Sequence, residues 1–167
     1  MITETSSPNK FSKSYFDYLK VLIDQLSVEN VSKFINLILE TRENNKTIFF
    51  IGNGGSASTA SHFVNDISLG SRQFEKPFRA ISLCDNQAVI TAIGNDDGYE
   101  NIFLQQLQTQ AKTGDVLVAI SASGNSPNII KAINWSKNNN IVTVGLSAFD
   151  GGELARLSDL NIHVPTQ

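Results

Sequence analysis

Residues 47–57 read TIFFIGNGGSA, a short apolar run that ends directly in a glycine-rich turn. Such a run is typical of a strand that is buried on both faces of a sheet. Similar runs follow at 78–83, 116–120, 141–146 and 160–164. Segments with helical spacing separate them, at 56–69, 87–93 with 100–109, 126–137 and about 153–157. This alternation predicts an α/β fold, a doubly wound parallel five-stranded sheet with right-handed crossovers, whose ligands bind beyond the carboxyl ends of the strands.

Two helices are expected before this sheet. The first spans 11–26, and its apolar face is formed by Tyr15, Leu19, Leu22 and Leu26. The second spans 28–41, and its apolar face is formed by Val31, Phe34, Ile35 and Ile38. Residues 1 to about 10 are polar and are expected to fray. The chain is thus predicted to be a single domain, with N-terminal helices over 1–45 and an α/β core over 46–167.

The composition excludes several classes of protein. The chain has 167 residues, 13 basic and 16 acidic side chains, a formal net charge of −3 and 41% hydrophobic residues. These values are typical of a globular domain, and a mildly acidic chain without a basic run is a poor binder of nucleic acids or membrane surfaces. Cys84 is the single cysteine, which excludes a disulfide framework and fits a reducing compartment. We therefore expect a cytoplasmic protein with no nucleic-acid or membrane partner.

The turn at residues 52–57 leads directly from the first predicted strand into a helix. Glycines permit positive φ and let backbone amides approach a ligand closely, and a helix N-terminus attracts anions. The spacing also matches the dinucleotide pattern G-x-G-x-x-A, but the lysine of a P-loop is absent. Taken alone, this turn fits an anion site and a plain tight turn equally well.

A second loop follows the predicted strand at 116–120 and carries Ser121, Ser123 and Ser126. Pro127 comes next, so Ser126 is expected to cap a helix. Several hydroxyls and backbone amides then converge on one helix start, which suits a phosphate monoester. A dinucleotide site requires an acid about 20 residues beyond the glycines, whereas Asp85 lies further on. The two loops favour a sugar monophosphate over NAD and leave a nucleotide-binding dehydrogenase as the weaker alternative.

Several motifs occur in a specific order along the chain. GNGGS at 52–56 is followed by His62, AIGNDDGY at 92–99, GDV at 114–116, SASGNS at 121–126 and GG at 151–152. Over essentially its whole length the chain resembles the sugar isomerase (SIS) domain and, within it, the phosphoheptose isomerase family. The resemblance implies an isomerase that converts sedoheptulose 7-phosphate to D-glycero-D-manno-heptose 7-phosphate, for surface polysaccharides such as lipopolysaccharide. It also implies a homotetramer with active sites between subunits. Phe11, Tyr18 and Val21 lie outside the first helix's apolar face and independently predict an oligomer interface.

The resemblance also assigns site residues. The positions that match the family's substrate contacts are Asn53, Gly54, Gly55, Ser56, Asn95, Asp96, Ser121, Ala122, Ser123 and Ser126. Ala122 stands where close relatives often have threonine, so one donor hydroxyl is missing. His62 matches a zinc-ligand position. Asp66 stands where the family has a glutamate that serves as both a zinc ligand and the catalytic base.

Helical spacing relates His62 and Asp66 independently of any resemblance. One apolar stripe of the predicted helix is formed by Ala57, Ala60, Phe63, Val64 and Ile67. His62 and Asp66 are four residues apart and share the opposite face. Spacing alone fits a solvated pair better than two zinc ligands, whereas the resemblance favours zinc. Aspartate is a methylene shorter than glutamate, which shortens its reach.

The main alternative function is a non-catalytic SIS protein that binds phosphosugars or associates with the bacterial replication initiator. The His62–Asp66 pair favours the enzyme, since such an adaptor does not need a metal-binding helix. In the family, a helix after the last strand supplies a Gln or Glu and a His, whereas the sequence ends at Gln167. We therefore expect this C-terminal helix to be missing, the zinc ligand set to be incomplete and the isomerase to be poorly active. Cys84, Trp135 and His163 are interpreted as structural.

Overall fold

The computed structural model describes residues 7–166, whose strands form one five-stranded sheet in the order β2-β1-β3-β4-β5. Each pair of neighbouring strands runs parallel. The strands are β1 Thr47–Gly52, β2 Arg79–Ser82, β3 Val116–Ser121, β4 Val142–Ala148 and β5 Leu160–Val164. Each strand overlaps one predicted apolar run, so the predicted doubly wound α/β fold is confirmed.

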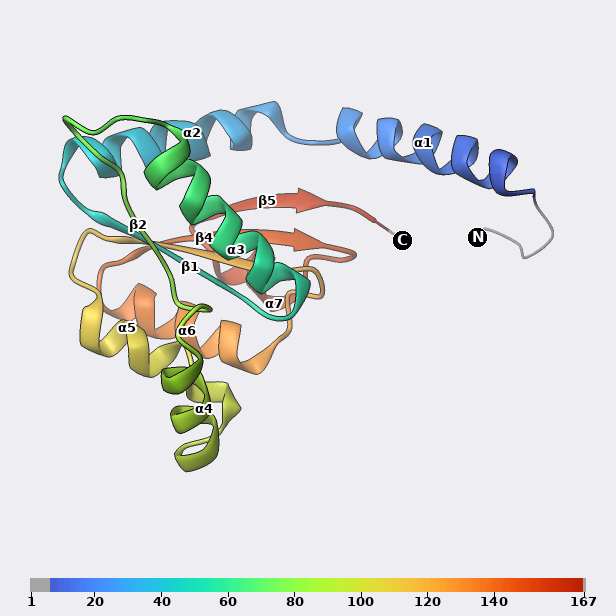
Figure 1. Cartoon of the computed structure of the whole chain (residues 1–167). Helices are drawn as coiled ribbons and strands as arrows, with labels where there is room; N and C mark the ends of the chain where they lie inside the picture. The colour runs from blue at the N-terminus through green and yellow to red at the C-terminus, as the bar shows by residue number, and fades with distance from the viewer. Residues whose placement is uncertain (1–6, 167) are drawn as a thin grey trace.

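Helices cover both faces of this sheet (Figure 1). The α-helices of the described residues are α1 Pro8–Asp24, α2 Val28–Glu43, α3 Gly55–Asn65, α4 Gln87–Asp96, α5 Leu104–Gln110, α6 Pro127–Asn138 and α7 Gly152–Leu157. The chain also forms a π-helical segment, η1 Asp66–Gly70, and a 3₁₀ turn, η2 Tyr99–Asn101. α2 and α3 pack on one face, whereas α5, α6 and α7 pack on the other.

The central strand β1 is apolar at successive positions because both of its faces are buried. Phe49 and Ile51 pack toward α5 and α6, whereas Ile48 and Phe50 pack toward α2 and α3. Each of the four is at most 1% exposed. Phe50 also stacks on Phe63 of α3, with ring centroids 5.5 Å apart. Burial of each large apolar side chain contributes about 1.5–3 kcal/mol, so the turn after β1 begins from a firmly packed strand.

α1 starts earlier than predicted and extends beyond the sheet (Figure 1). The Ser7 hydroxyl accepts a hydrogen bond from the Lys10 amide at 3.4 Å. Residues 8–10 are therefore helical, and the expectation that they fray is wrong; residues 1–6 lie outside the described part of the chain. Leu22 is buried, but several apolar side chains of α1 are exposed: Phe11, Tyr15, Phe16, Val21 and Ile23. No helix within residues 7–166 has the length and apolar character needed to cross a membrane.

α2 packs through a slightly different face from the predicted one. Ile38 is buried and Phe34 is partly buried against the sheet, as expected. Ile35 was expected on the same face, but 52% of it is exposed. Leu37 packs against the sheet in place of Ile35. Thr41 is also buried, so the inward face of the helix is rotated away from Ile35.

The helix predicted at 56–69 is divided into two parts. α3 ends at Asn65, and Asp66 begins the π-helical segment η1. The wider turn is closed by the Ser71 amide, which donates to the Asp66 carbonyl at 2.9 Å. A π-helical turn changes the angular spacing of side chains and is frequent at functional sites. Asp66 therefore lies at the junction of two helix geometries, which a constant helical period could not predict.

Candidate functional site

The strand order reverses beside β1, since β2 lies on one side of it and β3 on the other. Gly52, the last residue of β1, is in register with Ile120 near the end of β3. The turn after β1 and the loop after β3 are therefore neighbours at the carboxyl edge of the sheet. Open parallel sheets bind ligands at this kind of switch point. The structure thus brings the two predicted loops together.

The turn after β1 requires glycine for two different reasons. A Cβ atom added to Gly52 would lie 2.6 Å from the carbonyl oxygen of Ser56, so the helix start leaves no room for a side chain. Gly54 has φ +52°, which favours glycine. The amides of Ser56 and Ala57 both donate to the Asn53 carbonyl, which closes the turn. Gly54 and Gly55 remain exposed above it.

The serine loop after β3 places two hydroxyls side by side. Ser121 is buried, and its Oγ lies 3.5 Å from the Oγ of Ser126. Ser126 occupies the N-cap position of α6, but its side chain makes no capping hydrogen bond, contrary to our expectation. The hydroxyl of Ser123 accepts a hydrogen bond from the Asn125 amide at 3.4 Å, and Ala122 is exposed. The Ser126 hydroxyl is consequently not used by the helix that it precedes.

Gly151 and Gly152 hold the serine loop from the adjacent strand connection. A Cβ added to Gly152 would lie 2.4 Å from the Ser123 carbonyl oxygen, so only glycine permits this approach. Gly124 has φ +64° and packs against the backbone of Gly151. The Leu154 amide donates to the Gly124 carbonyl at 2.9 Å. These contacts explain the GG motif, since both glycines fix the serine loop from the side.

A cavity of about 490 Å³ lies between the two loops and η2. Its lining residues are Asn53, Tyr99, Glu100, Ser126, Pro127 and Asn128. Asn53 and Ser126 were predicted as site residues, whereas Tyr99, Glu100 and Asn128 were not. Asn128 is only 2% exposed and exchanges two hydrogen bonds with Asn53. In the sequence, only its position just after Ser126-Pro127 could have pointed to Asn128 as a site residue. Its partner Asn53 lies 75 residues away, so the pairing itself leaves no local pattern.

The other predicted site residues form separate groups. Asn95 and Asp96 end α4, where the Asn95 amide donates to the Asp96 carboxylate at 2.7 Å; both are exposed and neither lines the cavity. His62 Nε2 lies 3.2 Å from Asp66 Oδ2, with 75% and 59% of the side chains exposed. The two side chains therefore meet on one exposed face, although Asp66 belongs to η1 rather than to α3. Across residues 7–166, no three His, Cys, Asp or Glu side chains gather closely enough to hold a metal ion.

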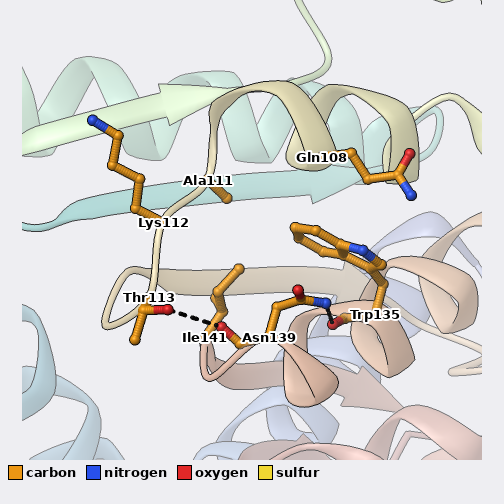
Figure 2. A pocket seen from close by; sticks show the side chains of 7 residues that line it. All are labelled: Gln108, Ala111, Lys112, Thr113, Trp135, Asn139 and Ile141. Carbon is orange, nitrogen blue, oxygen red and sulfur yellow. Dashed lines mark hydrogen bonds between the residues drawn. The ribbon is translucent and has the colours of Figure 1, made fainter.

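A second hollow, of about 400 Å³, lies at the amino ends of β3 and β4. Figure 2 shows the side chains that line it. The Asn139 side chain donates to the Trp135 carbonyl at 2.8 Å, and the Thr113 hydroxyl donates to the Asn139 carbonyl at 3.5 Å. The Lys112 side chain points away from it (Figure 2). The side chains of Asn139 and Thr113 are thus engaged by nearby backbone. Trp135 packs against the core, consistent with the structural role expected of that residue.

Cys84 and His163 both contact neighbouring strands. The Cys84 thiol donates to the Gly52 carbonyl at 3.4 Å, and burial raises the pKa of the thiol above its usual range. A thiol with a raised pKa is a poor nucleophile near neutral pH, which supports a structural role for Cys84. His163 is half-buried rather than fully on the surface, with Nδ1 3.2 Å from the Ser147 hydroxyl.

A parallel sheet with a glycine turn and a serine loop at its switch point defines a class of α/β domain. Residues 13–148 match the model of the family described as "SIS domain". The phosphoheptose isomerase of Aneurinibacillus thermoaerophilus is 38% identical over 148 residues, which cover 88% of this chain and 74% of that protein. Phosphoheptose isomerase 2 of Campylobacter jejuni is 40% identical over 165 residues, covering 95% and 81%.

The structure of phosphoheptose isomerase GmhA from Neisseria gonorrhoeae superposes with a TM-score of 0.88 at 30% sequence identity. The match covers 96% of this chain and 88% of that chain. The chain belongs to the phosphoheptose isomerase family of SIS-domain proteins. The resemblance drawn from its motifs is therefore confirmed.

Proposed function

We propose that this isomerase interconverts sedoheptulose 7-phosphate and D-glycero-D-manno-heptose 7-phosphate, in the cytoplasm, for surface-polysaccharide precursors such as those of lipopolysaccharide. The observation that carries the proposal is the meeting of the serine loop and Asn53 at one cavity. Supporting it, relatives that match most of the chain are named phosphoheptose isomerases. The lone free thiol of Cys84 suits a reducing compartment.

The phosphate group is proposed to bind at the serine loop. Ser121, Ser123 and Ser126 supply hydroxyls there, beside the N-terminus of α6. A helix N-terminus stabilises an anion. Binding of this remote phosphate holds the sugar so that its reacting carbons face the general base, and binding energy contributes to catalysis in this way. Asn53, Gly54, Gly55 and Ser56 are proposed to contact the sugar from the adjacent turn, and Asn95 and Asp96 its distal hydroxyls.

Asp66 is proposed as the general base. Its carboxylate removes a proton from C1 of the ketose, the carbon next to the C2 carbonyl, and an enediolate forms. Return of that proton to C2, with transfer of the O1 proton to O2, gives the aldose. Proton transfer by a positioned side chain typically accelerates such a step by about 10²–10⁴-fold. The Asp66 side chain is 59% exposed in the single chain, so a neighbouring subunit or the substrate must exclude water there.

His62 and Asp66 do not by themselves fit a catalytic zinc ion. A catalytic zinc site has about three protein ligands, whereas the described residues bring only this pair together. Zinc remains part of the proposal only as an ion that needs further ligands, and no step of the reaction is derived through it. Imidazole and carboxylate are nonetheless suitable first ligands.

The enzyme is proposed to work as a homotetramer. The exposed apolar side chains of α1, including Phe16 and Ile23 at 59% and 65% exposure, support association with further copies of the chain. α1 also extends beyond the sheet (Figure 1), so it can reach a neighbouring copy.

The function is tested by following conversion of sedoheptulose 7-phosphate to the aldose with purified protein, beside Asp66→Asn and Glu75→Gln variants. We expect wild type and the exposed-carboxylate control Glu75→Gln to turn over the ketose, and Asp66→Asn to lose at least about 100-fold in kcat. Equal turnover by Asp66→Asn would remove Asp66 from the mechanism. Tight binding without any turnover by wild type would favour the phosphosugar-binding adaptor instead.

A further inference from the structure

The side-chain amides of Asn53 and Asn128 form a reciprocal pair at the cavity. Asn53 Nδ2 donates to Asn128 Oδ1 at 2.9 Å, and Asn128 Nδ2 donates to Asn53 Oδ1 at 2.9 Å. Asn53 belongs to the turn after β1, whereas Asn128 belongs to the first turn of α6. The pair therefore ties the glycine turn to the helix that follows the serine loop. Asn128 is 2% exposed, so loss of its partner would leave a buried amide without that hydrogen bond.

The backbone fixes the direction of both amides. The Ile129 amide donates to Asn128 Oδ1 at 3.0 Å. Because a backbone N–H can only donate, the Asn128 atom that it meets must be the oxygen. Asn128 Nδ2 then faces Asn53, and only the oxygen of Asn53 can accept from it. Neither amide can flip without placing two donors or two acceptors against each other.

Tyr99 completes this network from η2. Its hydroxyl donates to Asn53 Oδ1 at 3.1 Å. An amide oxygen has two acceptor positions, and both positions of Asn53 Oδ1 are thus occupied. One N–H of Asn53 remains, and the Tyr99 oxygen keeps its own lone pairs. Both residues line the cavity, together with Ser126 of the serine loop.

We propose that Asn128 and Tyr99 are positioning residues that fix the hydrogen-bonding direction of Asn53, so that the cavity offers a sugar one donor from Asn53 and one acceptor from Tyr99. The inference rests on the proposed function, since it assigns the sugar half of the same site. The ligand class is a polyol phosphate with a hydroxyl that accepts from Asn53 and a hydroxyl that donates to Tyr99. A phosphate without a polyol chain makes neither contact.

The test compares two ligands, sedoheptulose 7-phosphate and inorganic phosphate, on Tyr99→Phe and Asn128→Leu. Tyr99→Phe removes a single oxygen from an exposed ring and should raise the KM and Kd of the sugar phosphate about 2- to 10-fold, the value of one hydrogen bond. Asn128→Leu keeps the size of the side chain without adding charge, leaves Asn53 without its partner and should raise them by at least about 10-fold. The affinity for inorganic phosphate should stay within about 2-fold of wild type in both variants.

Matched controls are Tyr15→Phe on α1 and Asn134→Leu on the exposed side of α6. A readout without ligand is the Asn53 side-chain amide in ¹⁵N NMR, whose proton bonded to Asn128 should exchange slowly with water in wild type and quickly in Asn128→Leu. An equal loss of affinity for sedoheptulose 7-phosphate and inorganic phosphate would indicate a general loss of structure and would overturn the inference. Unchanged sugar-phosphate affinity in both variants would overturn it while the proposed function stands. Failure of wild type to bind sedoheptulose 7-phosphate would overturn the proposed function, and the inference with it.

Discussion

Gly124 and Gly151 approach so closely that a Cβ atom on Gly124 would lie 2.1 Å from the Gly151 carbonyl oxygen. Gly124 belongs to the serine loop after β3, and Gly151 belongs to the connection between β4 and α7. Two neighbouring connections of the sheet thus support each other at its carboxyl edge. The shape of the proposed phosphate site therefore depends on backbone packing as well as on hydroxyl groups.

Gly124→Ala should damage the site and the fold together. The alanine would need φ near +64° and would collide with backbone, so we expect a loss of at least about 2 kcal/mol in the free energy of unfolding. Urea denaturation measures this loss. The control is Gly94→Ala in α4, where a Cβ meets no atom within 4 Å and should stabilise the helix by up to about 1 kcal/mol. Equal stability of the two variants would contradict the packing argument.

Replacing both Ser123 and Ser126 by alanine should weaken binding of the sugar phosphate. Each hydroxyl is expected to donate to a charged phosphate oxygen, so each loss should cost about 1–3 kcal/mol of binding free energy. Isothermal titration calorimetry measures the change, with Ser32→Ala on the exposed side of α2 as the control. Unchanged affinity in the double variant would refute the proposed phosphate site.

Local patterns in the sequence predicted most of the fold because they report burial directly. The five apolar runs became the five strands, since a parallel sheet covered on both faces requires such runs. The glycine turn and serine loop were also predictable, since local backbone geometry requires their residue types. The Asn53–Asn128 pair could not be predicted, because it depends on the register of β1 with β3 and joins residues 75 positions apart. The start of the π-helical segment at Asp66 leaves no signal in an otherwise regular apolar stripe.

The stability of the protein should depend on pH through Asp159. Burial acts to raise the pKa of Asp159, but hydrogen bonds from the Thr143 hydroxyl and amide, together with Lys137, outweigh it and hold the pKa below its usual value. The carboxylate therefore stabilises the fold above its unfolded pKa of about 3.9. This stabilisation is lost as the pH falls through the lower pKa of the folded state.

Asp159→Asn should accordingly lower the free energy of unfolding by about 1 kcal/mol at pH 7, and the difference from wild type should shrink as the pH falls below about 4. Urea denaturation at several pH values measures both quantities. The exposed Glu75→Gln is the control and should behave as wild type at pH 7. A difference between Asp159→Asn and wild type that grows toward low pH would contradict the direction of this pKa shift.

Zinc content should depend on assembly. A single chain offers His62 and Asp66, so monomeric protein should hold far less than one zinc ion per chain. Elemental analysis of fractions separated by size exclusion, with mass from light scattering, measures this. Phe16→Glu with Ile23→Glu should shift the protein toward monomer, because both side chains belong to the exposed apolar face of α1. Tight stoichiometric zinc on a monomer would contradict the two-ligand account.

The most direct test of the account is ¹H and ¹³C NMR of the protein with sedoheptulose 7-phosphate in D₂O. Deprotonation beside the carbonyl gives an enediolate that can take deuterium from solvent, so the reaction is visible at the exchanging carbons. The account predicts signals of the aldose heptose 7-phosphate, part of it deuterated at C2, with both signals strongly reduced in the Ser123→Ala, Ser126→Ala variant. Absence of aldose and of deuterium exchange at saturating ketose, with and without added zinc, would contradict it.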